Sequence, residues 1–300
     1  MTKLSRRRFL TISAACSVLP SLGIAAPTAH WRGVALGAEA RLRLEGLTDQ
    51  EAAPVFAAVE AELNRLENIF NLYRPASELS RLNKNGSLNA PAPELLSVLG
   101  LCSTLHHATE GAFDPSVQPL WSALAIGADE KAIHSARNSI GWEKVTVRTD
   151  IIRLPEPGFS ALTLNGIAQG VITDRIAALL KSHSLRNVLI DMGEVVANGQ
   201  RTDGERWCVG VAGPDGSVLK RITLQDRAIA TSDAQNLMLT DRHGHILHPK
   251  GLALQNRLLS VSAQSAALAD GLSTALCALP AARHQTALRQ FPQARIEARL

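Results

Sequence analysis

Two polar segments of the sequence carry groups that suit a phosphorylated ligand and a hard metal ion. Residues 164–170 read LNGIAQG and lead into an expected helix over residues 171–183. A glycine-flanked turn at a helix start offers free N–H groups and the positive end of the helix dipole, which suit a phosphate or diphosphate. Glycine also lets the backbone approach a ligand closely. The same residues fit a tight turn without a ligand.

The second segment is an apolar helix expected over residues 265–279, in which Asp270 and Thr274 are the polar pair. They are four residues apart, so they share one face of the helix. Polar groups that are buried without partners are costly. A carboxylate and a hydroxyl suit Mg²⁺, with backbone and phosphate oxygens completing its shell. The alternative is a pair that bonds to the backbone inside the fold.

Two further features are compatible with chemistry. His243, His245 and His248 lie within six residues, and they can ligate a transition metal or supply a base. Histidines on a surface without any role fit this pattern too. Tyr73 is the only tyrosine, and its ring can stack on a flat heteroaromatic ligand or pack in the core.

The elements that must position these residues mix helices and strands. Partial alternation over residues 35–44 predicts a strand, and Thr48 with Glu51 forms a capping-box pattern at the start of a helix. The other expected helices span residues 78–82, 93–109, 127–140 and 281–290, and the other expected strands span residues 145–148, 151–154, 188–190, 207–212, 219–224 and 228–230. Without a regular βαβ repeat, this order predicts an α+β fold in one mature domain over residues 30–300.

Composition excludes several classes of protein. The chain has 300 residues, 46% hydrophobic and 19% charged, which predicts a folded core and argues against a disordered chain. Aromatic residues make up 4%, too few for a nucleic-acid reader built on stacking. Four Lys and Arg residues lie in the first 29 positions, and the rest of the chain carries 27 Lys+Arg against 27 Asp+Glu. A basic face for nucleic acid is therefore not expected.

Residues 1–29 have the pattern of an export signal. A basic start, SRRRFL from Ser5, precedes an apolar stretch and small residues, and it resembles the twin-arginine motif. The stretch contains Pro20 and several polar residues, so it is not expected to span a membrane. Residues 1–29 are therefore interpreted as a twin-arginine-type signal peptide, the mature chain is expected in the periplasm, and no transmembrane span is expected in it. A basic tail on a cytosolic protein is the alternative.

Several blocks, in this order, resemble the ApbE family, the FAD:protein FMN transferases, from about residue 35 to the C-terminus. They are LYRPASELSRLN at 72–83, GAFDPSV at 111–117, NGIAQG at 165–170, AIATS at 228–232, HILHP at 245–249 and AALADGLSTAL at 266–276. The resemblance implies a single ApbE-like domain with mixed sheets and flanking helices. It also implies Mg-dependent transfer of FMN from FAD to a Thr or Ser hydroxyl of a partner protein, with release of AMP.

The resemblance also implies roles for particular residues. Metal ligands would be the backbone oxygen of Gly166 with Asp270 and Thr274, and His245 and Asp270 would be catalytic, with His245 helping to activate the acceptor hydroxyl. The implied flavin contacts are Leu36, Tyr73, Ala112, Phe113, Asp114, Thr163, Gln169 and the Ile246 region.

The chain departs from the family pattern at several positions. The usual Met-Gly-Thr is LGA at 36–38, an Asp is Thr163, a Lys is Gln169, and the Asp of the His-Ile-Ile-Asp-Pro block is His248. With the leader, these departures resemble the NosX branch, whose acceptor is the membrane flavoprotein NosR. Two alternatives remain at this point: a non-catalytic periplasmic flavin carrier, and an FAD pyrophosphatase that gives FMN and AMP.

Overall fold

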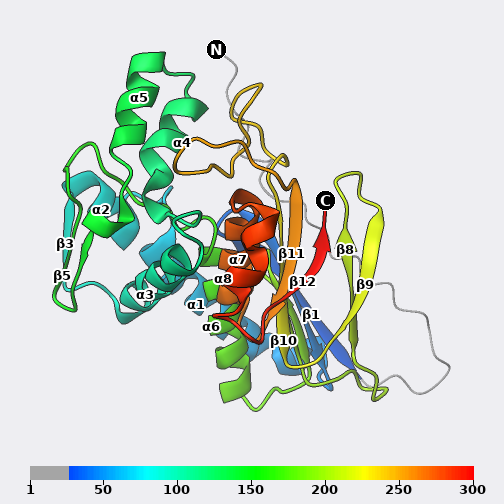
Figure 1. Cartoon of the computed structure of the whole chain (residues 1–300). Helices are drawn as coiled ribbons and strands as arrows, with labels where there is room; N and C mark the ends of the chain where they lie inside the picture. Colours follow the sequence, from blue (N-terminus) through cyan, green and yellow to red (C-terminus); the bar gives the residue numbers. More distant parts are fainter. Residues whose placement is uncertain (1–26) are drawn as a thin grey trace.

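A seven-stranded antiparallel sheet forms the centre of the protein (Figure 1). The structure is a computed structural model that describes residues 27–300. Neighbouring strands follow the order β1 (Thr28–Ala35), β2 (Ala38–Glu45), β6 (Val188–Asp191), β7 (Val195–Asn198), β10 (Arg227–Asp233), β11 (Leu258–Ala263) and β12 (Arg295–Arg299). The expected signal peptide, up to residue 26, lies outside the described residues. Its last two positions, 28 and 29, begin strand β1.

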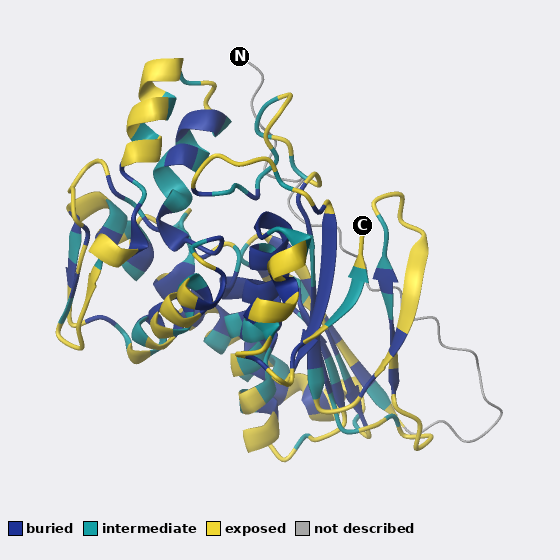
Figure 2. Ribbon diagram, viewed as in Figure 1, coloured by how far each residue is buried: buried dark blue, intermediate teal, exposed yellow. Residues whose placement is uncertain are grey.

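The two faces of this sheet are covered differently (Figure 1). Helices α1 (Asp49–Phe70), α6 (Ala168–Ser182), α7 (Ala266–Ala278) and α8 (His284–Leu288) lie on one side, over the main hydrophobic core. The hairpin of β8 (Trp207–Ala212) and β9 (Val218–Leu224) lies on the other side, over a smaller core that includes Val195, Trp207 and Ile229. Figure 2 shows the exposed outer side of β9 and the buried strands behind it.

A second group of elements extends from the helical side of the sheet. It contains α2 (Glu78–Asn85), α3 (Pro93–Ala108), α4 (Gln118–Ala125) and α5 (Glu130–Asn138), with a small sheet of β3 (Ser87–Asn89), β5 (Ile151–Arg153) and β4 (Thr146–Val147). The α+β fold in a single domain is therefore confirmed. Among residues 27–300, no helix combines the length and the hydrophobicity needed to cross a membrane.

Local sequence explains where several elements begin. The Thr48 hydroxyl accepts a hydrogen bond from the Glu51 N–H at 3.3 Å, and the Thr48 N–H donates to the Glu51 carboxylate at 2.8 Å, so the predicted capping box is present. The alternate residues Ala38, Ala40 and Leu42 of β2 are buried as predicted.

Three differences from the predicted elements have physical reasons. Helix α6 begins at Ala168, three residues earlier than expected, so the glycine-rich segment forms its first turn. Strand β1 was not predicted, because its alternation of polar and apolar residues is interrupted by Gly33 and by the exposed Val34. Strand β11 was not predicted either: all six of its residues are buried, so it lacks the polar alternation of a half-exposed strand.

Candidate functional site

The two polar segments meet where helix α6 begins beside helix α7. A Cβ atom built on Gly166 would lie 2.8 Å from Cγ2 and 3.0 Å from Oγ1 of Thr274. One turn further along α6, the Gly170 N–H donates to Asp270 Oδ2 at 3.1 Å. A Cβ on Gly170 would overlap the carbonyl oxygen of Ala266. Two glycines therefore bring the expected phosphate-binding turn into contact with the expected metal ligands.

Asp270 is enclosed, with 4% of its surface exposed. Burial raises the pKa of Asp270 to about 7, the Gly170 N–H lowers it, and the charge of Asp174 raises it further. A nearby cation or further hydrogen-bond donors would stabilise the charged form of such a buried carboxyl group. The Thr274 hydroxyl lies beside it on the same helix face and is 3.3 Å from the Ser232 hydroxyl.

These groups fit a hard cation. Within residues 27–300, no three His, Cys, Asp or Glu side chains gather to hold a metal ion. Mg²⁺ does not need such a cluster, because it is commonly bound through one or two carboxylates, with substrate phosphates and water completing its shell. The Asp270 carboxylate, the Thr274 hydroxyl and the backbone of Gly166 supply oxygen donors only, in keeping with that preference.

Gln169 and Glu194 line the same part of the molecule. Gln169 is buried, its Nε2 has no hydrogen-bond partner, and a Cβ on Gly193 would overlap this amide. Burial raises the pKa of Glu194 well above its usual value, and the charges of Asp270 and Asp191 raise it further. Sequence reasoning missed Glu194. Its signal was an acidic residue directly after a glycine in a tight turn between two apolar strands.

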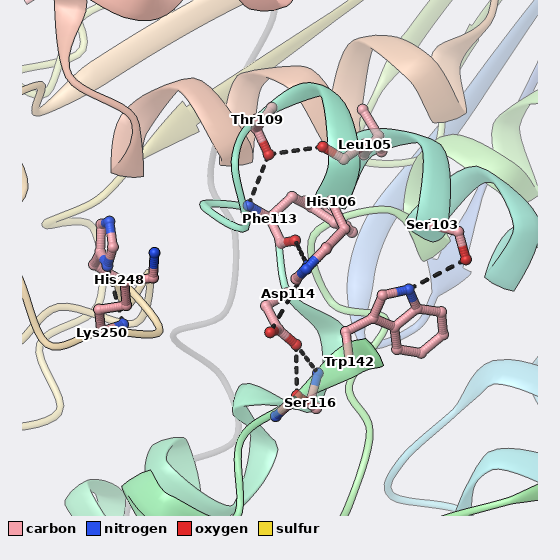
Figure 3. Close-up of polar contacts among 11 residues, drawn as sticks. Ser103, Leu105, His106, Thr109, Phe113, Asp114, Ser116, Trp142, His248 and Lys250 are labelled. Atoms are coloured by element: carbon pink, nitrogen blue, oxygen red, sulfur yellow. Dashed lines mark hydrogen bonds and ion pairs between the residues drawn. The ribbon is translucent and has the colours of Figure 1, made fainter. Parts of the chain in front are cut away.

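The loop from Gly111 to Pro115 is held by a network of polar contacts (Figure 3). The Thr109 hydroxyl donates to the Leu105 carbonyl at 2.7 Å and accepts from the Phe113 N–H at 3.0 Å. His106 Nδ1 lies 2.9 Å from the Phe113 carbonyl oxygen and 3.8 Å from Asp114 Oδ2. Ala112 and Phe113 are buried, so packing and these hydrogen bonds both hold the loop in place beside the site.

Asp114 serves mainly as an internal acceptor in this state. Its Oδ1 accepts from the Ser116 N–H at 2.8 Å and from the Ser116 hydroxyl at 2.5 Å. Burial raises the pKa of Asp114, and the Ser116 bonds lower it. The loop is tied to the α6 turn by the Thr163 N–H, which donates to the Pro115 carbonyl at 2.8 Å. Residues 111–115 and 163–170 therefore form one continuous site wall.

Leu36 and Tyr73 are joined to each other through a residue that sequence reasoning missed. The Leu36 N–H donates to Glu67 Oε1 at 2.8 Å, and Glu67 forms an ion pair with Arg74, the neighbour of Tyr73. Leu36 has φ +49°, and 66% of the surface of Tyr73 is exposed. An exposed ring next to a fixed turn is available to stack on a ligand. Glu67 was missed because it falls on the buried side of a helix otherwise read for its apolar residues.

Ile246 is buried and His245 is half-buried in the loop after β10. The His245 N–H donates to the Leu237 carbonyl at 2.8 Å, and its ring Nδ1 has no partner. Burial lowers the pKa of His245, which favours the neutral ring. His248 differs: its Nδ1 accepts from the Lys250 N–H at 3.0 Å, and Figure 3 draws this pair apart from the Asp114 network.

The predicted residues thus fall into four groups. Gly166 lies against Thr274, Gly170 bonds to Asp270, and Gln169 directly precedes Gly170 in the same turn. The Thr163–Pro115 bond adds Ala112, Phe113 and Asp114. The Ser232–Thr274 contact connects α7 to the end of β10, from which the loop with His245 and Ile246 departs. Leu36 and Tyr73 are held together by Glu67 and Arg74, as a separate unit.

Comparisons with known proteins agree with this arrangement. The model of the ApbE family matches residues 36–300. A protein of Haemophilus influenzae named FAD:protein FMN transferase is 27% identical over 249 residues, which cover 74% of this chain and 71% of the relative. One of Salmonella typhimurium with the same name is 24% identical over 301 residues, covering 92% and 85%.

A solved structure is similar over nearly the whole chain. The flavin transferase ApbE from Vibrio cholerae aligns with a TM-score of 0.79 at 25% identity, covering 90% of this chain and 93% of that one. The family match includes every segment that builds the site, from the turn at Leu36 to helix α7. The chain therefore belongs to the ApbE family.

Proposed function

We propose that this chain transfers the FMN half of FAD to a Thr or Ser hydroxyl of a partner protein and releases AMP. Curated relatives of this chain are named FAD:protein FMN transferase. The observation that carries the proposal is the meeting of Gly166, Asp270 and Thr274 at the start of α6. This meeting places a dipole end suited to phosphate beside oxygen donors suited to a divalent cation.

The protein groups bind and orient the two halves of the substrate. The first turn of α6 faces the diphosphate, and the wall of residues 111–115 and the exposed ring of Tyr73 hold the flavin. Bound by Asp270, Thr274 and the Gly166 backbone, Mg²⁺ would neutralise charge on the diphosphate and on the leaving AMP. Asp270 then remains anionic, because the cation opposes the effect of burial on its pKa.

The transfer is a substitution at phosphorus. The acceptor oxygen forms a bond to the phosphorus on the FMN side, and the bond from that phosphorus to the bridging oxygen breaks. AMP leaves with that oxygen, and the hydroxyl proton passes to a base. His245 suits this role, because burial lowers its pKa and its Nδ1 has no partner in the protein.

The decisive experiment supplies FAD, Mg²⁺ and a candidate acceptor to the mature chain. Mass spectrometry of the acceptor is expected to show one covalently added FMN on a Thr or Ser, with one AMP released per FMN added. Free FMN formed without an acceptor would identify a pyrophosphatase. Bound FAD that yields neither product would identify a flavin carrier.

The acceptor and the location are inferred from the leader together with the departures from the family pattern. With an export signal over residues 1–29, the mature chain would work in the periplasm on a membrane-bound electron-transfer flavoprotein similar to NosR. This part of the proposal rests on the sequence pattern alone. Flavinylation of such a protein in cells that carry the chain, and its absence in cells that lack it, is the expected result.

A further inference from the structure

Helices α6 and α7 meet through three antiparallel contacts spaced one helical turn apart. Gly166 contacts Thr274, Gly170 bonds to Asp270, and Asp174 bonds to Ala266. From the turn at Gly166 into α6, each contact lies four residues further along the chain and four residues back along α7. The first two contacts build the site, and the third lies about 12 Å from the first along α6.

Asp174 forms the third contact, and both of its carboxylate oxygens accept hydrogen bonds from the start of α7. Its Oδ1 accepts from the Ala266 N–H at 2.7 Å, and its Oδ2 accepts from the Ala267 N–H at 3.0 Å and from the Ser265 hydroxyl at 2.7 Å. The backbone donors belong to the first turn of α7, where no carbonyl within the helix can accept them. A carboxylate from α6 therefore caps α7, while Asp270 of α7 accepts a first-turn N–H of α6.

The two glycines and the carboxylate contribute different constraints. Gly166 and Gly170 let the helices come close, but of their contacts only the single bond from the Gly170 N–H to Asp270 is directional and resists sliding along the helix axis. Slipping by one turn would move Asp270 about 6 Å from the Gly170 N–H. Bonds from one carboxylate to three donors at the end of α7 are directional and charge-assisted, so they oppose that slip.

We propose that Asp174 is a positioning residue that fixes the register of α7 against α6, and so sets Asp270 and Thr274 against the Gly166 turn. This inference rests on the proposed function, because it assigns Asp174 to the support of the same metal-binding groups. Asp174 is not expected to contact FAD or the metal ion. Residues that support metal ligands in this way typically change metal affinity by about 10- to 100-fold when they are replaced.

The test compares metal affinity with stability in three variants. Asp174→Asn keeps the side-chain volume but replaces one carboxylate oxygen, which accepts hydrogen bonds, with an amide NH₂ group. This group can only donate, and it would face the N–H or O–H donors at the start of α7. Ser265→Ala removes one of the three hydrogen bonds to the same carboxylate, together with the N-cap bond that the Ser265 hydroxyl accepts from the Leu268 N–H at 3.2 Å, and serves as the milder change because both backbone bonds to Asp174 remain. Ile176→Val is the matched control, because Ile176 is fully buried on α6 and its replacement destabilises the fold without touching the first turn of α7.

The probe is Mn²⁺, titrated with FAD present and followed by the loss of the free-ion electron paramagnetic resonance signal, with thermal unfolding measured in parallel. Asp174→Asn is expected to weaken Mn²⁺ binding by about tenfold or more, and Ser265→Ala by a smaller factor. Ile176→Val is expected to lower the melting temperature and leave Mn²⁺ affinity unchanged.

The outcomes separate the two proposals. Wild-type chain that fails to take up Mn²⁺ would contradict the metal site of the proposed function, and this inference with it. Wild-type binding with unchanged affinity in Asp174→Asn would overturn the positioning role alone. A loss of affinity in Ile176→Val that matches the loss in Asp174→Asn would show that general destabilisation, and not register, accounts for the effect. If Asp174→Asn does not fold, Ser265→Ala decides: unchanged affinity there overturns the inference.

Discussion

Asp270→Asn should make the metal-free protein more stable at pH 8 while abolishing transfer. Burial raises the pKa of Asp270 from 3.8 to about 7 in the folded chain. Between these values the folded state binds a proton that the unfolded state has released, so the contribution of this group to stability falls as the pH rises. Above pH 7 Asp270 is charged in the folded protein, and the cost of burying this charge lowers the free energy of unfolding in full.

The size of the effect follows from the same shift. The pKa rises by about three units, and each unit corresponds to about 1.4 kcal/mol, so the carboxylate lowers the free energy of unfolding by about 4 kcal/mol at pH 8. Asparagine has nearly the same volume, and its amide oxygen can still accept the Gly170 N–H. The variant should therefore recover most of this free energy without losing the contact that joins the helices.

Urea unfolding after treatment with EDTA measures the difference directly. At pH 4 the two proteins should have nearly equal free energies of unfolding, and at pH 8 the Asn variant should exceed wild type by about 2 to 4 kcal/mol. Saturating Mg²⁺ should raise the stability of wild type at pH 8 and leave the variant unchanged, since the neutral amide is a poor ligand. A variant less stable than wild type at pH 8 without metal would refute the reasoning.

Four other expectations follow from the site and the leader. Thr274→Ala should raise the Mg²⁺ concentration needed for half-maximal transfer while keeping measurable activity, because a neutral hydroxyl is the weaker ligand; complete loss would contradict this ranking. Gln169→Lys should tighten FAD binding about tenfold in a fluorescence titration, about 1.4 kcal/mol, because an ammonium would replace a buried amide without a partner; unchanged or weaker binding would show that the missing charge is not limiting. His245→Ala should slow transfer with FAD affinity preserved, and should remove the loss of rate expected in wild type when the ring of His245 is protonated; because burial lowers the pKa of His245, that loss is expected on the acidic side of the ordinary imidazole range, as a pH series of initial rates would test. Replacing both Arg6 and Arg7 by Lys should leave the precursor in the cytoplasm on cell fractionation, and normal export would rule out the twin-arginine route.

Local sequence signals predicted those elements whose stabilising contacts and hydrophobic pattern lie within one short segment of the chain. The cap formed by Thr48 and Glu51 needs four residues, and the hydrophobic face of β2 needs eight, so both could be read directly. The pairing of Asp270 with Thr274 was also local, because a helix places residues four apart on one face. The family resemblance then supplied their roles, which spacing alone left open.

The parts that escaped prediction depend on distant partners. Asp174 looked like an ordinary polar residue on an amphipathic helix, and only the neighbouring helix start explains it. Glu67 was similar: its partners are a turn 31 residues earlier and the loop that follows its own helix. Six consecutive buried residues in β11 gave no alternation, because both sides of that strand are covered.

The bond between Gly170 and Asp270 joins residues 100 positions apart, which has a consequence for how the protein is made. Closing a loop of that size costs about 4 kcal/mol in chain entropy, apart from a constant term. A ribosome must also release α7 before the start of α6 can be completed. Polypeptides that end before residue 266 should therefore form part of the sheet and yet bind neither nucleotide nor metal. During synthesis, the ability to bind FAD would be acquired near the end, when nearly the whole chain has emerged.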